Sequence, residues 1–204
     1  MKKVTMRLVL VLAFSVAASL LFFACASAPK EEIAATQTAI QAAQTDDVRT
    51  YAEESLKDAT DTMAKATAEV QTQDEKFALS RDYKAASDLL KQAKEKAAKV
   101  VTDAQANKAK AKADAEALIT SLTPMLADAK KALATAPRGK DTKAELEAMQ
   151  SDLKSAEEAL TAATQAMSQE KYKDALGQAN TAKTKASGII EQVNAAKAKL
   201  RGGK

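Results

Sequence analysis

The chain has 204 residues, with 31 basic and 27 acidic side chains and a formal net charge of +4. Removal of an N-terminal segment that contains Lys2, Lys3 and Arg7 leaves 28 basic residues against 27 acidic ones, which argues against nucleic-acid binding. Because histidine is absent, the usual general base and metal ligand are missing, and we predict no enzyme, no cofactor and no metal site.

The first 24 residues have the organisation of an export signal. Three basic residues precede an apolar run over residues 8–24, which is interrupted only by Ser15 and Ser19. This run is at the short limit for a membrane span of about 20 residues, and no basic cluster follows it at once. We therefore predict a signal peptide over residues 1–24 that is removed.

The segment Leu21-Phe22-Phe23-Ala24-Cys25 resembles the lipobox of bacterial lipoproteins. The resemblance implies cleavage between Ala24 and Cys25 and attachment of acyl chains, such as palmitate, to Cys25. This residue is the only cysteine, so an intramolecular disulfide is excluded. Ala26 resembles the residue that follows the cysteine in lipoproteins sorted to the outer membrane of enteric bacteria. The alternatives are ordinary signal cleavage near Ala24-Cys25-Ala26 and an uncleaved anchor.

The remainder of the chain has the composition of long helices. Residues 25–204 contain 44 alanines, and the whole chain has no tryptophan, five glycines and three prolines. We predict an all-α fold of elongated antiparallel helical hairpins that form a coiled-coil-like bundle. Each buried methylene contributes about 0.8 kcal/mol, so every alanine layer adds little stability, and self-association could complete the packing.

A first helical hairpin region is predicted over residues 31–136, after a short tether at 25–30. It begins with a helix over about 31–44, and Thr45-Asp46-Asp47 then supplies capping carboxylates for the next helix. Apolar residues follow at alternating spacings of three and four, which is a heptad seam: Ala52, Leu56, Ala59, Met63, Ala66 and Val70. After a turn at 80–82, the returning helix repeats the spacing with Tyr83, Ala86, Leu90, Ala93, Ala97, Val100 and Ala104.

The seam weakens from Gln105, because the heptad places Asn107 and Asp114 where apolar residues belong. Leu118, Leu122, Leu126, Ala129 and Leu133 then renew an apolar face. We expect Pro124 to kink or break this third helix at Thr123. The clearest linker is Ala136-Pro137-Arg138-Gly139-Lys140, and the main subdivision of the chain is predicted there.

A second helical hairpin is predicted over residues 141–200, with a flexible C-terminal tip at 201–204. Thr142-Lys143-Ala144-Glu145 matches a capping box. The seam of the first helix then comprises Leu146, Met149, Leu153, Ala156, Leu160, Ala163 and Met167. After a turn at 168–171, the seam of the last helix comprises Tyr172, Ala175, Ala179, Ala182, Ala186, Ile189, Val193, Ala196 and Leu200.

The two hairpins resemble copies of one unit. Asp82-Tyr83-Lys84-Ala85-Ala86 aligns with Lys171-Tyr172-Lys173-Asp174-Ala175 at an offset of 89. The preceding helices match through Leu56-x2-Ala59-x3-Met63 and Leu153-x2-Ala156-x3-Leu160. Duplication is favoured over convergence of two alanine-rich helices. We expect each tyrosine ring to cover the end of a core while its hydroxyl stays in water.

The chain also resembles a family of small alanine-rich bacterial lipoproteins that is classed as a domain of unknown function. The likeness covers about residues 25–104 and lies in Cys25-Ala26-Ser27-Ala28-Pro29, Ala39-Ile40, Tyr51-Ala52-x3-Leu56-x2-Ala59 and Asp82-Tyr83-x2-Ala86. It implies an envelope location and helical hairpins but no activity. A tetratricopeptide repeat is rejected, because its Trp, Gly and Pro positions and its 34-residue period are missing.

Charged residues indicate solvated helix faces and no catalytic group. Carboxylates occur as the neighbours Asp46-Asp47, Glu53-Glu54 and Glu157-Glu158. Alternation with alanine spreads Lys108, Lys110 and Lys112 around a helix, as it does Lys197 and Lys199.

The terminal Lys204 resembles the lysine through which murein lipoproteins are joined to peptidoglycan, which makes it a candidate attachment residue. The alternative is a frayed helix end.

We therefore predict a lipid-anchored cell-envelope lipoprotein that acts as a non-enzymatic structural spacer or scaffold and is peptidoglycan-associated through Lys204. The first expected partner is the membrane, to which the lipid on Cys25 attaches the protein. The protein is expected to face the periplasm. The alternative is a periplasmic interaction module or chaperone-like assembly factor that binds an envelope protein. An exposed apolar strip that remains after both seams are filled would favour that alternative.

Overall fold

The computed structural model describes residues 27–139 and 142–202. It is 88% helical, and the described residues contain no strand. The all-α bundle predicted from the sequence is thus confirmed. The predicted signal peptide at 1–24, Cys25 and Lys204 lie outside the described residues.

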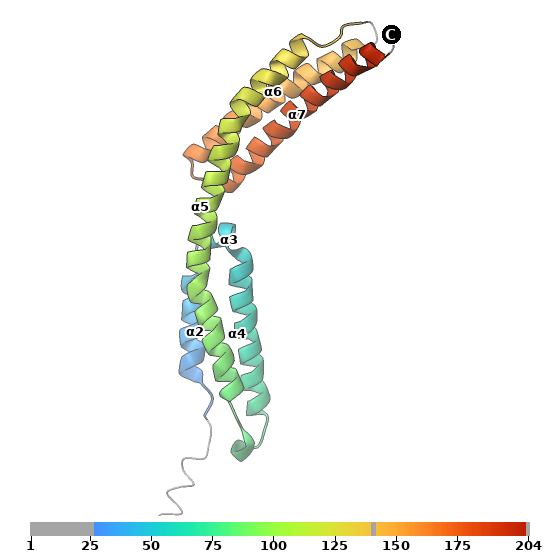
Figure 1. Ribbon diagram of the computed structural model, residues 1–204. Coiled ribbons are helices and arrows are strands. Elements are labelled where there is room, and N and C mark those ends of the chain that lie inside the picture. Colours follow the sequence, from blue (N-terminus) through green and yellow to red (C-terminus); the bar gives the residue numbers. More distant parts are fainter. Residues whose placement is uncertain (1–26, 140–141, 203–204) are drawn as a thin grey trace, which may run out of the picture. The chain divides into compact units, whose positions relative to one another are not determined.

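Two compact units make up the chain, and the boundary between them falls after Gln105. Unit 1 contains the helices α2 (Lys30–Ala42), α3 (Asp46–Tyr51) and α4 (Glu53–Asp74), the short 3-10 helix η1 (Ala78–Ser80) and the first part of α5 (Lys84–Ala134). Unit 2 contains the remainder of α5 with α6 (Lys143–Ser168) and α7 (Tyr172–Gly202) (Figure 1).

The boundary between the units differs from the predicted subdivision at residues 136–140. It lies inside α5, where the sequence showed only a weakened seam from Gln105. Asn107 and Asp114 are exposed there, while Ala111 and Ala115 are buried. The linker after α5 instead joins two neighbouring helices of unit 2. The helix α5 therefore supplies core residues to both units. The boundary between the units follows the packing of side chains along this helix and does not coincide with a loop.

Unit 1 is a bundle in which α4 and α5 run antiparallel, joined by η1, and α2 lies against both. The predicted seams supply its core: Ala59, Met63, Ala66 and Val70 on α4 and Ala86, Leu90, Ala93, Ala97, Val100 and Ala104 on α5 are all buried. The Thr36 hydroxyl on α2 donates to the Leu90 carbonyl at 3.4 Å. Lys96 on α5 donates to Asp58 and Thr62 on α4 at 2.9 and 3.0 Å.

The connection from α2 to α4 is more broken than the sequence predicted. The cap of α3 is the Thr45 hydroxyl, which accepts a hydrogen bond from the Val48 amide, whereas the sequence had suggested capping carboxylates in this segment. The helix then stops after six residues, because Ala52 has φ −141° and ψ 32°. The buried Val48, Tyr51 and Ala52 place apolar groups at this break. Packing thus outweighs the helix propensity of alanine at this position.

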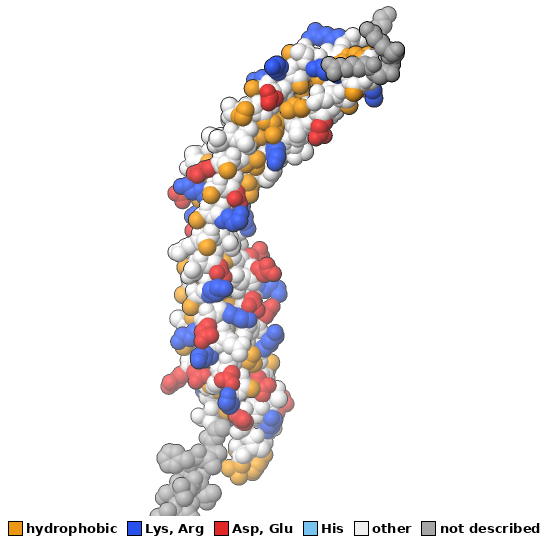
Figure 2. Space-filling model, in the orientation of Figure 1, with side chains coloured by type: hydrophobic (Ala, Val, Ile, Leu, Met, Phe, Trp, Pro, Cys, Tyr) orange, Lys and Arg blue, Asp and Glu red, His pale blue; other side chains and the backbone are white. Residues whose placement is uncertain are grey.

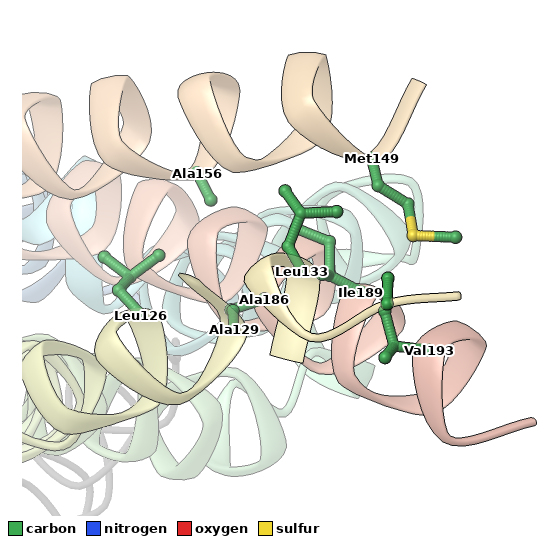
Figure 3. Close-up of a cluster of buried hydrophobic side chains, with 9 residues drawn as sticks. Leu126, Ala129, Leu133, Met149, Ala156, Ala186, Ile189 and Val193 are labelled. Atoms are coloured by element: carbon green, nitrogen blue, oxygen red, sulfur yellow. The ribbon is translucent and has the colours of Figure 1, made fainter. Parts of the chain in front are cut away.

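Unit 2 is a three-helix bundle with larger apolar groups at one end of its core. That end contains Leu126, Ala129, Leu133, Met149, Ala156, Ala186, Ile189 and Val193 (Figure 3). A neighbouring cluster consists of Leu122 with four alanines, namely Ala159, Ala163, Ala179 and Ala182. Ion pairs tie the helices together at the surface: Lys130 lies 2.5 Å from Glu157, and Lys185 lies 2.7 Å from Asp152.

Pro124 does not break α5, so of the two outcomes expected at Thr123, a kink or a break, the break does not occur. The helix is continuous from Lys84 to Ala134 with Pro124 inside it. Proline removes one backbone donor from a helix and crowds the preceding turn. Here Pro124 is exposed, while Leu122 and Leu126 on either side of it are buried. The core contacts of these leucines therefore hold the helix through the proline.

The predicted capping box of α6 is wrong. Thr142 does not cap α6 through its side chain; its hydroxyl oxygen accepts a hydrogen bond from the Gly139 amide at 2.8 Å. The side chain therefore closes the preceding loop. At the other end of unit 2, α7 continues through Arg201 and Gly202, which the sequence assigned to a flexible tip. Leu200 does not extend the seam, because it is 63% exposed.

The buried positions of the two units correspond, which supports the predicted duplication. At the offset of 89, Tyr83, Ala86, Leu90, Ala93, Ala97, Val100 and Ala104 match Tyr172, Ala175, Ala179, Ala182, Ala186, Ile189 and Val193, and all are buried. The sequence did not suggest that the third helix also matches. Ile33, Thr36, Ile40 and Ala43 have the spacing of Leu126, Ala129, Leu133 and Ala136. The repeated element is therefore a three-helix unit.

Glu170 has the backbone conformation that glycine ordinarily supplies at the end of a helix. Its φ is 58°, and the following Lys171 amide donates to the Ala166 carbonyl at 3.0 Å, which is a Schellman ending of α6. A left-handed conformation costs a residue with a Cβ about 1–2 kcal/mol.

We expect Glu170→Gly to raise the free energy of unfolding by about 1 kcal/mol, because relief of this conformation outweighs the added freedom of the unfolded chain. Urea unfolding followed by circular dichroism measures the change. Glu170→Ala is the matched control, because it also removes the contact of 3.8 Å with Lys108 but keeps the Cβ. A stabilisation equal to that of the alanine variant would contradict the backbone explanation.

Candidate functional site

The described chain begins at the end of unit 1 where α4 finishes and α5 starts. Ala28 and Ile33 pack against a buried cluster of Val70, Tyr83 and Ala86. The Lys30 amide donates to the Ala28 carbonyl at 2.8 Å. Since Cys25 precedes Ala28 by three residues, the predicted lipid-attachment residue is covalently close to this end of the unit. This end is therefore the candidate functional site, and we call it the anchor-proximal end.

Buried polar groups order the turn at the anchor-proximal end. Gln73 is 6% exposed, and its side-chain oxygen accepts a hydrogen bond from the Asp82 amide at 3.1 Å. The Tyr83 hydroxyl donates to an Asp74 carboxylate oxygen at 2.5 Å. This hydrogen bond, together with burial, raises the pKa of Tyr83. The sequence suggested a hydroxyl in water and no partner for it; the structure adds the exposed Asp74 carboxylate as its partner.

The Arg81 side chain closes the turn by donating hydrogen bonds to backbone carbonyls at the C-terminal end of α4. Its guanidinium donates to the Asp74 carbonyl at 2.8 Å and to the Lys76 carbonyl at 3.0 Å. Ser80 donates through both its amide and its hydroxyl to the Phe77 carbonyl, in each case at 2.8 Å. A cation at a helix C-terminus is electrostatically favourable. These bonds give a nine-residue connection one defined conformation.

Two large apolar side chains project from this ordered turn. Phe77 is 75% exposed and Leu79 is 66% exposed, whereas Ala78 between them is partly buried. Figure 2 shows hydrophobic side chains gathered at the end of unit 1 that carries η1. The sequence prediction missed this pair, because it placed only a turn at 80–82. The available signal was Phe77 itself, the only phenylalanine after the predicted signal peptide and one that lies outside every seam.

Three of the neighbouring carboxylates lie within ion-pair distance of basic side chains. Lys130 lies 2.5 Å from Glu157, and Lys154 lies 3.9 Å from Glu158. Arg49 lies 3.9 Å from Asp46. In the described ranges, no group of three or more His, Cys, Asp or Glu side chains could hold a metal ion.

The lysines of the Lys-Ala-Lys run have separate partners. Lys110 lies 2.6 Å from Asp114, Lys112 lies 3.9 Å from Glu116, and Lys108 lies 3.8 Å from Glu170. The Lys112 ammonium also lies 6.0 Å from the centre of the Tyr172 ring. The run therefore has the local pairing of a solvated helix, as the sequence predicted, and does not offer a continuous basic stripe.

An open groove of about 500 Å³ lies between α2 and α5 in unit 1. Its lining includes Thr36 and Leu90, which are already bonded to one another, and charged side chains of both signs along the rim: Glu31, Glu32, Asp88, Lys91 and Lys94.

Among the described residues, no helix combines the length and apolar character that crossing a bilayer requires. No protein-family model, no curated protein and no solved structure matches the chain.

Proposed function

We propose that the chain is a lipid-anchored lipoprotein of the cell envelope that acts as a structural spacer or scaffold. The observation that carries this proposal is the continuity between the lipobox-like segment ending at Cys25 and the folded unit, since Ala28 is already packed against α4 and α5. Two or more acyl chains on one residue form a stable anchor. A bundle attached with so little intervening chain suits a protein that holds material near a membrane.

The burial of most apolar residues in both units favours a spacer over the alternative, a chaperone-like interaction module. The seam residues pack inward in each unit, and the exposed large apolar residues that the structure describes are Phe77, Leu79, Val101 and Leu200. These positions do not form a strip along a helix, because they lie on three different elements. A client-binding groove needs a broader apolar surface. The interaction module is therefore the second candidate.

Absence of catalysis is part of the proposal. Carboxylates and lysines in the described ranges form ion pairs between or within helices, and a spacer requires no more from them. The likeness to the alanine-rich lipoprotein family, the outer-membrane location and the periplasmic orientation are likewise proposed, on the strength of residues 25–29.

Attachment to peptidoglycan through Lys204 is a separable part of the proposal. The helix α7 extends to Gly202, so Lys204 follows the end of a helix by two residues. Mass spectrometry of the protein from envelope fractions, with and without muramidase digestion, tests this linkage. A muropeptide adduct on Lys204 is expected, and its loss in Lys204→Arg is the control. Acyl groups without a muropeptide would remove the wall tether and retain the anchor.

The anchor itself is tested by Cys25→Ala. We expect wild-type protein to carry acyl groups on an N-terminal Cys25 and to fractionate with membranes, because several acyl chains partition together. The alanine variant should lose both properties. Intact-mass analysis and membrane flotation are the measurements, and Ser27→Ala is the matched control near the same junction. An unacylated mature mass for the wild type would overturn the proposed anchor.

A further inference from the structure

We propose that Phe77 and Leu79 form a second membrane contact, which inserts into the interfacial region of the bilayer beside the lipid on Cys25. This inference rests on the proposed lipid anchor. It names the η1 turn of unit 1 as the surface concerned and the acyl and headgroup boundary of a lipid bilayer as its partner. An anchor of one modified residue and a small apolar wedge act together as two signals.

The position of the turn supports a lipid partner. Ala28 packs against the cluster that includes Tyr83, and Tyr83 directly precedes α5 at the end of the η1 turn. Three residue steps separate Ala28 from Cys25, so the two Cα atoms are at most about 11 Å apart. The start of α2 lies at the same end of unit 1 as the connection between α4 and α5 (Figure 1). A lipid on Cys25 therefore brings this end, which carries Phe77 and Leu79, to the bilayer surface.

The order of the turn supports insertion of defined side chains. The side chains of Arg81 and Ser80 donate hydrogen bonds to three backbone carbonyls at the turn. The Gln73 side chain accepts a hydrogen bond from the Asp82 amide. A folded protein ordinarily hides its large apolar groups when the chain can rearrange. Here the hydrogen bonds hold a conformation in which two of them face solvent. An ordered wedge loses little conformational entropy when it binds.

Charge near the turn indicates that the contact is hydrophobic. The turn and its flanks carry charges of both signs, negative on Asp74, Glu75 and Asp82 and positive on Lys76 and Arg81. The Arg81 guanidinium also donates hydrogen bonds to backbone carbonyls. Neither sign dominates, so attraction to anionic lipids should contribute little. Binding to neutral vesicles and weak dependence on salt are therefore expected.

A tryptophan reporter tests the contact directly, because the natural chain contains no tryptophan. Phe77→Trp keeps an apolar aromatic group at the turn, and Val101→Trp places the same reporter at an exposed position on α5 in the same unit, away from the turn. Each acylated protein is reconstituted in phosphatidylcholine vesicles that contain brominated acyl chains. Emission of the tryptophan at 77 should shift to shorter wavelength and be quenched by bromine, whereas the control should respond to aqueous iodide.

A second measurement does not depend on a reporter. Replacing Phe77 and Leu79 together by serine should increase the rate of transfer of the acylated protein between neutral vesicles by roughly tenfold or more, because two large apolar groups are lost from the bilayer. Replacing Val101 by serine removes another exposed apolar group of unit 1, away from the turn, and should leave the rate unchanged.

The outcomes separate this inference from the proposed function. Flotation with vesicles, combined with iodide quenching at position 77 and no bromine quenching, would overturn the membrane contact and keep the anchor. Failure of the acylated protein to float would overturn both. A shift at position 77 that grows with protein density, without bromine quenching, would assign the turn to a second copy of the chain and would also overturn the inference.

Discussion

Replacement of Leu122 by alanine is expected to lower the free energy of unfolding of unit 2 by about 3 kcal/mol. Leu122 is fully buried and is the only large member of a cluster whose other buried residues are Ala159, Ala163, Ala179 and Ala182. The larger side chains packed against this cluster are only partly buried and can fill part of a cavity: Leu118, Ile119, Met125 and Leu160. The cost should therefore include the lost transfer free energy and the part of the cavity that they leave unfilled.

Urea unfolding followed by far-ultraviolet circular dichroism measures this loss, and hydrogen exchange locates it. Amides of α6 and α7 should exchange faster in Leu122→Ala, while those of α2 and α4 should keep their protection. Leu200→Ala is the matched control, because Leu200 is 63% exposed and its removal should change stability by less than about 0.5 kcal/mol. Equal losses in the two variants would show that Leu122 contributes no core packing.

The opposite substitution, Ala182→Leu, should also destabilise unit 2, by about 1–3 kcal/mol. Ala182 is fully buried on α7 and faces the same cluster. Small residues at such positions allow helices to approach toward about 8 Å. A leucine side chain has a larger volume than alanine, and only separation of the helices or an unfavourable rotamer can accommodate it.

Ala195→Leu controls for helix propensity, because Ala195 is exposed on the same helix. Alanine and leucine are both strong helix formers, so this control should change the unfolding midpoint little. The urea midpoint of each variant is the measurement. If Ala182→Leu were as stable as Ala195→Leu, the alanine seam of unit 2 would be loosely packed, contrary to the burial of its residues.

The heptad seams could be predicted because their spacing is a local property of the sequence. Ala59, Val100 and Ala163 lie at predicted seam positions and are buried. The seam does not determine which polar residues join the core: Thr36, Thr62 and Gln73 are buried, and each is held by a hydrogen bond. These bonds depend on neighbouring turns or on other helices, which the apolar pattern does not specify.

The boundaries of elements were harder to predict, since local signals compete with packing. Pro124 would end an isolated helix, yet it lies within α5 between two buried leucines. Thr142 and Glu145 have the spacing of a capping box, but the Thr142 hydroxyl binds Gly139 in the loop. Ala52, itself of the residue type with the highest helix propensity, separates α3 from α4. Buried neighbours decide the conformation at Pro124 and Ala52, whereas a competing hydrogen bond within the loop decides it at Thr142.

One part of the candidate site was predicted from the sequence and another part was not. The anchor residue Cys25 was predicted from a short motif, and it lies outside the described residues, as does Lys204. The apolar pair at positions 77 and 79 could not be predicted, because its exposure depends on how Arg81 and Gln73 order the turn. No periodicity marks side chains that are held away from a core.

The packing of Ala28 into unit 1 would also affect how the protein encounters other molecules, if Cys25 carries the proposed lipid. With so few residues between anchor and fold, unit 1 would diffuse in two dimensions within a thin layer at the membrane surface. Its effective concentration toward other molecules in that layer would rise, and it would be nearly zero toward those beyond the reach of the tether. Lengthening the chain before Ala28 would therefore change which encounters occur without changing any contact in the fold.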